Sequence, residues 1–220
     1  MEWYRSNIDS SKVTWSVAEN FRYLDSFVYA AEQVKKLGRV LGFRIRMTAM
    51  VKAGSKYYET AWRKTPEYQG GFLLDGGVHF IAGTRLMLGE ENEITRVSAF
   101  TAQLQEHLPP IDTLNATAKT KSGVSGTITF SFGTTFKGSG YSVACEKGTV
   151  TVIRSDVSVE KDGQEEKKSF PEEGAGVKQE VKAWGESISA GHADPRQSPE
   201  EALKDLKTVS SSSKCICELY

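Results

Sequence analysis

The stretch 112–161, DTLNATAKTKSGVSGTITFSFGTTFKGSGYSVACEKGTVTVIRSDVSVEK, decides the fold class. It consists of short runs rich in threonine, valine and other strand-forming residues, separated by turn-forming pairs such as Ser122-Gly123 and Lys147-Gly148. Such connections are shorter than the crossover of about a dozen residues that joins parallel strands, so consecutive strands should be antiparallel. Together with the run before Pro109-Pro110, the pattern predicts an antiparallel meander of strands at 95–104, 112–121, 124–134, 141–145, 149–154 and 157–161.

Two regions before this stretch also predict strands. Residues 13–23 (VTWSVAENFRY) are rich in β-branched and aromatic side chains, and residues 39–51 alternate, with Phe43 and Ile45 on one side and Arg44 on the other. Helices are predicted where apolar residues recur at helical spacing between capping and stop residues. The predicted helices are one from an Asp25 cap to Gly38, one in the second part of 70–88, one at 177–190, and one at 199–209 behind a Ser198 cap. Residues 162–176 are predicted to be a charged loop.

The predicted fold class is therefore α+β. We expect one domain with a large, mainly antiparallel open sheet and helices packed on one face, because sequential strands dominate the middle of the chain and helices flank them. Its core should extend from about residue 13 to residue 209, with 210–220 as a disordered or atypical tail.

Composition narrows the class of protein. The chain has 220 residues, of which 39% are hydrophobic and 25% charged, which is typical of a globular domain. Lys plus Arg equals Asp plus Glu at 28 each, so no excess positive charge favours nucleic acid or an anionic membrane as partner. The apolar runs are shorter than the ~20 residues of a membrane-spanning helix. Three cysteines, two of them in a C-x-C near the end, indicate reduced thiols and a cytoplasmic protein.

Several segments resemble the Gfo/Idh/MocA oxidoreductases. They are VAENFRY at 17–23, WRKTP at 62–66 and GGFLLDGGVHFIAGTRLMLG at 70–89, and within the last the glycine-flanked Asp75 to His79 is the most specific piece. The resemblance runs from about Val13 to Val209 and is strongest to a fungal, NADP-linked branch. It implies an NAD- or NADP-dependent enzyme acting on a sugar, polyol or related carbonyl compound.

Members of this family have two halves, and this chain resembles the second. The first half is a Rossmann domain that binds the dinucleotide and ends in a Glu-Lys-Pro segment; the second is the substrate-side domain. The sequence contains no G-x-G-x-x-G, and its nearest match, Gly138-Ser139-Gly140, is predicted to be a hairpin turn. We therefore expect the Rossmann domain to be absent and the chain to be inactive alone.

Asp75 and His79 are the candidate catalytic residues. If helical phase already holds at Asp75, the two side chains lie on one face and can line a cleft together. Imidazole has the pKa range of a base that accepts a hydroxyl proton, and Asp75 can orient the ring or bind a substrate hydroxyl. The structural alternative is that Asp75 caps a helix beginning near Gly77 and that His79 is a partly buried, hydrogen-bonded residue.

The resemblance also implies substrate contacts at Asn20, Arg22, Trp62 and Arg63, because these regions border the substrate pocket in the family. In the alternative interpretation Arg22 is a surface cation and Trp62 a core anchor. His107, His192 and the cysteines lack the spacing of a zinc site, so no metal is expected.

The resemblance favours a homo-oligomer formed through the sheet. Alternating residues such as Ile128, Phe130 and Phe132 could form a subunit interface, or helices of the same chain could cover them. The rival to the oxidoreductase interpretation is a non-catalytic dimerisation or binding domain, or a truncated gene product.

Overall fold

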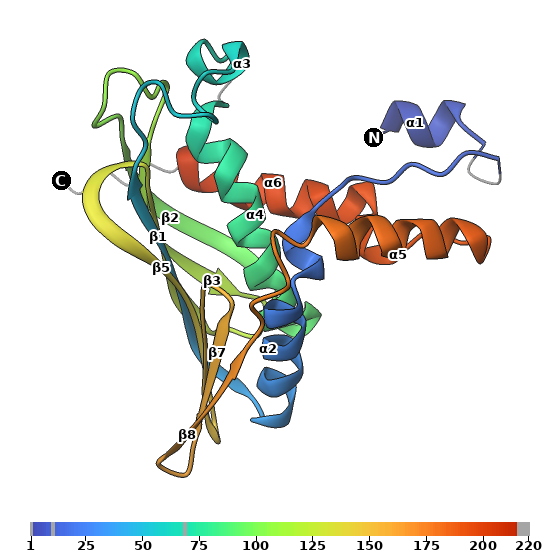
Figure 1. The fold of residues 1–220 in the computed structure, drawn as a ribbon, viewed down its shortest axis with the longest axis vertical. Helices are drawn as coiled ribbons and strands as arrows, with labels where there is room; N and C mark the ends of the chain where they lie inside the picture. The colour runs from blue at the N-terminus through green and yellow to red at the C-terminus, as the bar shows by residue number, and fades with distance from the viewer. Residues whose placement is uncertain (1, 10–11, 68–69, 215–220) are drawn as a thin grey trace.

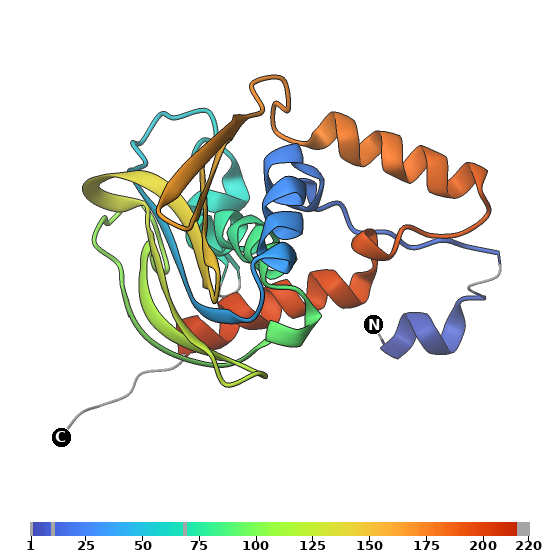
Figure 2. The same cartoon turned by 90° about the horizontal axis from the view of Figure 1, so that it is seen from below.

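In the computed structural model, residues 2–9, 12–67 and 70–214 are described. They form two layers, an open eight-stranded sheet and a layer of helices that covers one of its faces (Figures 1 and 2). The strands are β1 (Val40–Met50), β2 (Ile94–Ala102), β3 (Thr113–Thr120), β4 (Ser125–Ser131), β5 (Gly133–Cys145), β6 (Gly148–Ile153), β7 (Asp156–Lys161) and β8 (Gln164–Ser169). The helices are α1 (Glu2–Asn7), α2 (Asp25–Lys36), α3 (Ala61–Lys64), α4 (Gly71–Leu88), α5 (Val177–Ser189) and α6 (Pro199–Lys214), with 3₁₀ turns η1 (Asn20–Tyr23), η2 (Glu90–Asn92) and η3 (Pro195–Gln197).

The sheet confirms the predicted fold class with one change in topology. Its strand order is β2-β3-β4-β1-β5-β6-β7-β8, and every neighbouring pair is antiparallel except β1 and β4. β4 and β5 pair with opposite edges of β1, so the earlier strand β1 separates them. A parallel pair needs a long connection, and the chain between β1 and β4 is long enough to provide it. The connections within 112–161 are too short, so strands that follow one another there are antiparallel.

Three predicted segments have another secondary structure. Residues 13–23 form no strand, because 13–19 pair with no other strand and the segment ends in η1. The predicted loop 162–176 contains β8, whose side chains are all exposed and therefore show no alternation. Gly138-Ser139-Gly140 is not a hairpin turn but lies inside β5, opposite Arg46 to Thr48 of β1.

Helix α2 can be compared with the residues predicted to begin and end it. Phe27, Ala30 and Val34 are buried, as the spacing predicted, and Gly38 follows the helix end with a φ of 89°. Asp25 is the first helical residue and not the cap, which is Leu24 without a capping side chain. A carboxylate in the first turn still favours the helix, because it faces the positive end of the dipole.

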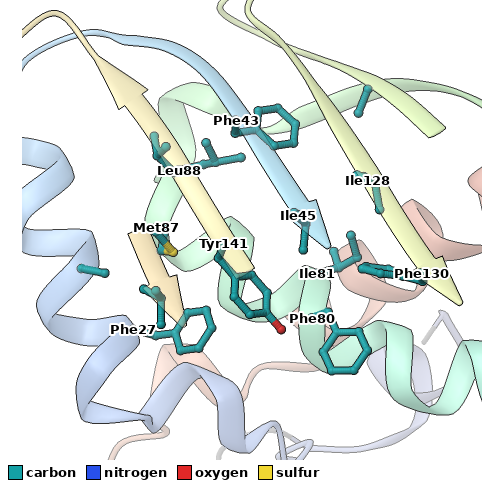
Figure 3. Close-up of a cluster of buried hydrophobic side chains, with 14 of the residues drawn as sticks. Phe27, Phe43, Ile45, Phe80, Ile81, Met87, Leu88, Ile128, Phe130 and Tyr141 are labelled. Atoms are coloured by element: carbon teal, nitrogen blue, oxygen red, sulfur yellow. The ribbon is translucent and has the colours of Figure 1, made fainter. Parts of the chain in front are cut away.

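The core lies between the sheet and the helices (Figure 3). Phe130 of β4 is fully buried and meets Phe80 of α4 with ring centroids 5.3 Å apart. A Cβ on Gly83 would lie 2.6 Å from the ring of Phe27, so this glycine lets α4 approach α2 closely. Ile128, Phe130 and Phe132 face helices of the same chain, which is the second of the two alternatives for that side of the sheet.

Helix α6 packs beside α4, and α5 packs against η1, farther from the sheet (Figure 2). α5 agrees with the predicted 177–190, and it leaves apolar side chains exposed, among them Val181 and Trp184. α6 continues to Lys214 instead of ending at Val209, and Ser198 caps it by accepting a hydrogen bond from the Glu201 N–H at 3.3 Å. The predicted tail was 210–220: residues 210–214 belong to α6, and residues 215–220 lie outside the described residues. Among the described residues, no helix is both long and apolar enough to cross a membrane.

Candidate functional site

A cleft of about 410 Å³ opens beside the N-terminal half of α4. One wall is the segment leading into η1, another is Trp62 of α3, and a third is α6. Four of its lining side chains are titratable: Glu19, Asp75, His79 and Asp205. The rest of the lining is mostly apolar, and the space has a size that suits a small molecule.

Asp75 and His79 lie together on one face of α4, as the spacing predicted. The helix begins at Gly71, so Asp75 lies inside it and is not a cap. The structural alternative for Asp75 is therefore wrong. His79 is partly buried and hydrogen-bonded, as the alternative for that residue expected, but its ring also lines the cleft.

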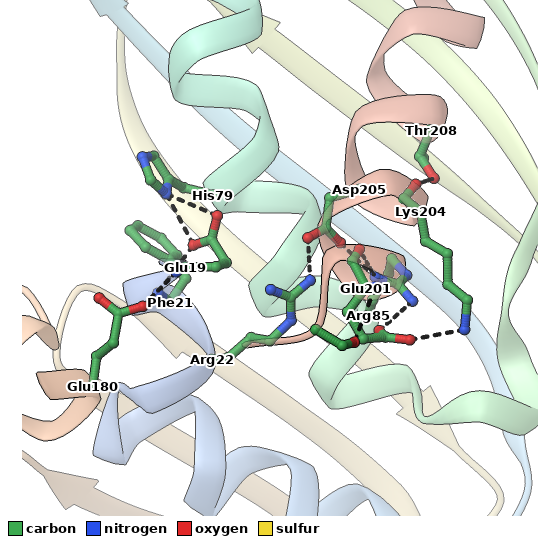
Figure 4. A network of polar contacts seen from close by, with 11 residues as sticks. Glu19, Phe21, Arg22, His79, Arg85, Glu180, Glu201, Lys204, Asp205 and Thr208 are labelled. Atoms are coloured by element: carbon green, nitrogen blue, oxygen red, sulfur yellow. Dashed lines mark hydrogen bonds and ion pairs between the residues drawn. The ribbon is translucent and has the colours of Figure 1, made fainter. Parts of the chain in front are cut away.

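His79 is held by a residue that the sequence analysis did not single out. The two carboxylate oxygens of Glu19 lie 2.9 and 3.1 Å from its Nδ1 (Figure 4). Phe21 stacks on the ring with centroids 5.5 Å apart and planes 24° apart. The carboxylate hydrogen bond raises the pKa of His79 above 6.5, although burial of the ring opposes the shift. We call Glu19 and His79 the dyad.

Asp75 has a different partner, Arg63. The Nε of Arg63 donates to Oδ2 of Asp75 at 2.8 Å, and its guanidinium lies over the Trp62 ring at 4.2 Å from the centroid. Trp62 is 53% exposed, so it is not the core anchor that the alternative interpretation expected. Two of the predicted substrate contacts therefore lie at the cleft, Trp62 in its wall and Arg63 bonded to Asp75.

The other two predicted contacts, Asn20 and Arg22, do not line the cleft. The Asn20 amide donates to the Ala175 carbonyl at 2.6 Å. Arg22 is 4% exposed and forms an ion pair with Asp205, so it is not a surface cation. Asp205 also accepts from Arg85, which in turn pairs with Glu201 at 2.7 Å (Figure 4). We call these four residues, Arg22, Arg85, Glu201 and Asp205, the charge cluster.

Sequence reasoning missed Glu19 because of where it lies. It lies inside the segment 13–23, which the pattern predicts to be a strand with a polar end, and an acid near the end of a strand is ordinary. Only the fold shows that Glu19 caps η1, accepting from the Phe21 N–H at 3.1 Å, and that this turn meets α4. The available signal was a single acid beside β-branched and aromatic residues.

The glycines at the start of α4 have a structural explanation. Adjacent glycines occur at the start of α4, where a phosphate could in principle approach the backbone. At Gly71, however, φ is 75° and a Cβ would lie 2.3 Å from the Pro109 carbonyl oxygen. That glycine is explained by packing against the chain itself. In the described ranges there is also no group of three or more His, Cys, Asp or Glu side chains able to hold a metal ion.

Comparison with known proteins agrees with this geometry. Residues 28–151 match the model of the GFO/IDH/MocA C-terminal domain, and the chain therefore belongs to that family. It is 39% identical to the dehydrogenase FPY6 of Fusarium mangiferae over 96% of this chain and 62% of that protein. An oxidoreductase of Thermotoga maritima superposes with a TM-score of 0.80 at 28% identity, over 91% of this chain and 60% of that one. The predicted family and the similarity to a fungal member are confirmed.

A more distant structure shares the fold. Levoglucosan dehydrogenase, solved with NADH and levoglucosan, has a TM-score of 0.73 at 17% identity over 96% of this chain and 67% of its own. The chain thus spans about three fifths of the length of the fungal and Thermotoga relatives.

Proposed function

We propose that this chain is the substrate-side domain of an NAD- or NADP-dependent oxidoreductase acting on a sugar, polyol or related carbonyl compound. The observation that carries the proposal is the cleft in which Asp75 and His79 lie one helical turn apart, beside an exposed aromatic ring. Family membership supports the reaction class, and levoglucosan dehydrogenase is a sugar enzyme of the same fold.

The side chains suit that chemistry. The ring of His79 can take a proton from a substrate hydroxyl, and its raised pKa favours holding that proton. Asp75, fixed by Arg63, can accept a hydrogen bond from a second hydroxyl. Trp62 offers an exposed flat face to the C–H side of a sugar ring. We assign Trp62 and Arg63 as substrate contacts, and Arg22 to holding Asp205 at the cleft.

The dinucleotide would be bound outside this chain. A nicotinamide cofactor supplies or accepts the hydride in such enzymes, and the left-handed Gly71 at the start of α4 packs against the chain itself. We therefore expect the isolated chain to bind neither NADH nor NADPH and to be inactive by itself. The buried free thiol of Cys145 agrees with a reducing compartment, and we propose the cytoplasm.

Nuclear magnetic resonance tests the substrate part of this proposal. With four Trp and three His in the chain, the Trp62 indole and His79 ring signals can be assigned by single substitutions. Adding a panel of pyranoses and polyols should shift these two signals and leave those of Trp3 and His192 in place. Calorimetric titration with NADH and NADPH should show no heat of binding. Unmoved Trp62 and His79 signals, or tight binding of either nucleotide, would overturn the assignment.

A second candidate, a dimerisation module, is favoured by the outer face of the sheet. Phe100 of β2 is 63% exposed and Ile153 of β6 is 51% exposed, whereas their neighbours Ala99 and Val152 are buried under the helices. A homo-oligomer that covers this outer face would bury them. Sedimentation velocity should show a dimer that Phe100→Glu and Ile153→Glu convert to monomer. A monomeric wild type at high concentration would exclude it.

A further inference from the structure

We propose that Glu19 is a positioning residue that fixes the ring of His79 with its proton on Nδ1, so that Nε2 is the nitrogen offered to the cleft. The chemical role of Nε2 rests on the proposed function above. The arrangement of the ring does not, because it follows from contacts within this chain.

Glu19 is itself held firmly. Its side chain is 6% exposed, its Oε1 accepts from the Phe21 N–H at 3.1 Å, and its own N–H donates to the carboxylate of Glu180 on α5. The capped turn η1 also carries Phe21, which stacks on the His79 ring. One turn of chain therefore supplies both the hydrogen bond and the flat surface that fix the ring.

The direction of the hydrogen bond determines which nitrogen can react. An ionised carboxylate only accepts, so a bond between Glu19 and Nδ1 requires the proton to be on Nδ1. In neutral imidazole the lone pair is then on Nε2. Among the described residues Nε2 has no hydrogen-bond partner, and Figure 4 shows it on the side of the ring away from Glu19. A substrate hydroxyl can give its proton to Nε2, and Glu19 then faces an imidazolium.

Asp75 does not supply this function. It lies one turn from His79 on the same helix, but its Oδ2 is engaged by Arg63 at 2.8 Å. The two carboxylates thus have different partners: Glu19 contacts the His79 ring, and Asp75 is held by Arg63. This corresponds to the arrangement in hydrolytic triads, where a buried carboxylate orients a histidine that exchanges protons through its other nitrogen.

Every packed element contributes an acid near the ring. Glu19 precedes η1, Asp75 is on α4, and Glu180 is on α5; all three favour the protonated ring, and burial opposes them. Asp205 of α6 lines the same cleft but is paired with Arg22 and Arg85. Glu19 contributes most because it is in direct contact.

Long-range ¹H–¹⁵N correlation spectra of the 220-residue chain, recorded across pH, test the inference. In the wild type the neutral His79 ring should show the proton on Nδ1. Glu19→Gln removes the charge but keeps a hydrogen-bonding group, so the pKa of His79 should fall. Glu19→Ala removes both, so the single tautomer should be lost as well. The signals of His107 and His192 are internal controls, and circular dichroism confirms folding.

Asp75→Asn is the matched control, because it removes another negative charge that raises the pKa of His79 without touching Nδ1. It should leave the tautomer unchanged and lower the pKa of His79 less than Glu19→Gln does. An unchanged pKa in Glu19→Gln, or a proton on Nε2 in the wild type, would overturn the inference. These spectra report the ring and not turnover, so failure of the sugar titration would leave their result intact. If Glu19→Ala does not fold, Glu19→Gln still decides.

Discussion

The charge cluster and the dyad lie close together, yet they differ in what they leave unpaired (Figure 4). In the charge cluster two guanidinium groups face two carboxylates, and the side chain of Asp205 is 2% exposed. Among the described residues, Nη1 of Arg22 is the atom of this cluster that is buried without a hydrogen-bond partner. In the dyad one buried carboxylate faces a ring that is 38% exposed. The ring nitrogen that Glu19 does not contact, Nε2, belongs to a residue that lines the cleft.

This difference distinguishes a structural role from a chemical one. A closed set of matched charges joins α4, α6 and η1, because each charge needs its partners to remain buried. A pair that leaves one titratable atom at a cleft can exchange a proton with a ligand. Arg22 was predicted to contact substrate, but it does not line the cleft. Glu19 was not singled out, yet it lines the cleft.

The largest expected effect is loss of stability when the charge cluster is broken. Asp205→Ala leaves Arg22 and Arg85 without their shared carboxylate in a buried site. Removing one partner of a buried ion pair typically costs about 3–5 kcal/mol in the free energy of unfolding. Urea denaturation followed by circular dichroism measures it, and a loss below about 1 kcal/mol would mean that the cluster is not a structural tie.

Two further variants serve as controls for that experiment. Glu200→Gln removes an ion pair with Arg5 in which both side chains are about half exposed, and should cost about 0.5 kcal/mol or less. The triple variant Arg22→Met, Arg85→Met, Asp205→Leu removes the charges together and should recover most of the loss, because no buried charge is left without a partner among these three.

The same contrast explains what could be predicted from sequence. Periodicity and turn residues gave α2, β1 and most of the strands, because each of these buries one face against a core. β8 could not be found, since all of Gln164–Ser169 is exposed and its partner β7 alone makes it a strand. Gly138-Ser139-Gly140 has turn residues but is held straight by β1, a long-range contact that no local pattern reports.

The site divides in the same way. Asp75 and His79 could be predicted because both are on one helix at a fixed spacing. Their partners could not, since Arg63 is on α3 and Glu19 precedes η1, and neither distance follows from position along the chain. Spacing gives neighbours within an element, whereas ion pairs between elements need the fold.

A moderate effect is expected where the cleft meets this network of ion pairs. Arg63→Met removes the hydrogen bond to Asp75, which is partly buried. A hydrogen bond to a charged group contributes about 1.5–3 kcal/mol, and exposure places this one at the lower end. The urea midpoint should fall less than in Asp205→Ala. Sugar-induced shifts at His79 should also weaken, because Arg63 would no longer hold the Asp75 carboxylate in place.

A smaller effect should depend on pH and separate the dyad from the charge cluster. Glu19 raises the pKa of His79 above 6.5 in the folded chain, so the folded state binds this proton more tightly than the unfolded state does. The stabilisation is complete below pH 6.5 and is lost as pH rises through the folded pKa. The difference in unfolding free energy between wild type and His79→Asn should therefore shrink as pH is raised.

His192→Asn measures the background of replacing an exposed histidine. A wild-type advantage over His79→Asn that grew with pH would mean that the ring is held neutral in the folded chain, and that Glu19 does not favour its proton.

The smallest effect on stability, and the most specific effect on binding, is expected from Trp62→Ala. The ring is 53% exposed and its main contact is the guanidinium of Arg63 above it, so the free energy of unfolding should change by about 0.5 kcal/mol or less. The flat face offered to a sugar would be lost, and sugar-dependent shifts at His79 should disappear. Trp184→Ala removes a ring of similar exposure on α5, outside the cleft, and should leave those shifts intact. Equal behaviour of the two variants would mean that the cleft wall does not recognise the ligand, because exposure alone cannot distinguish the rings.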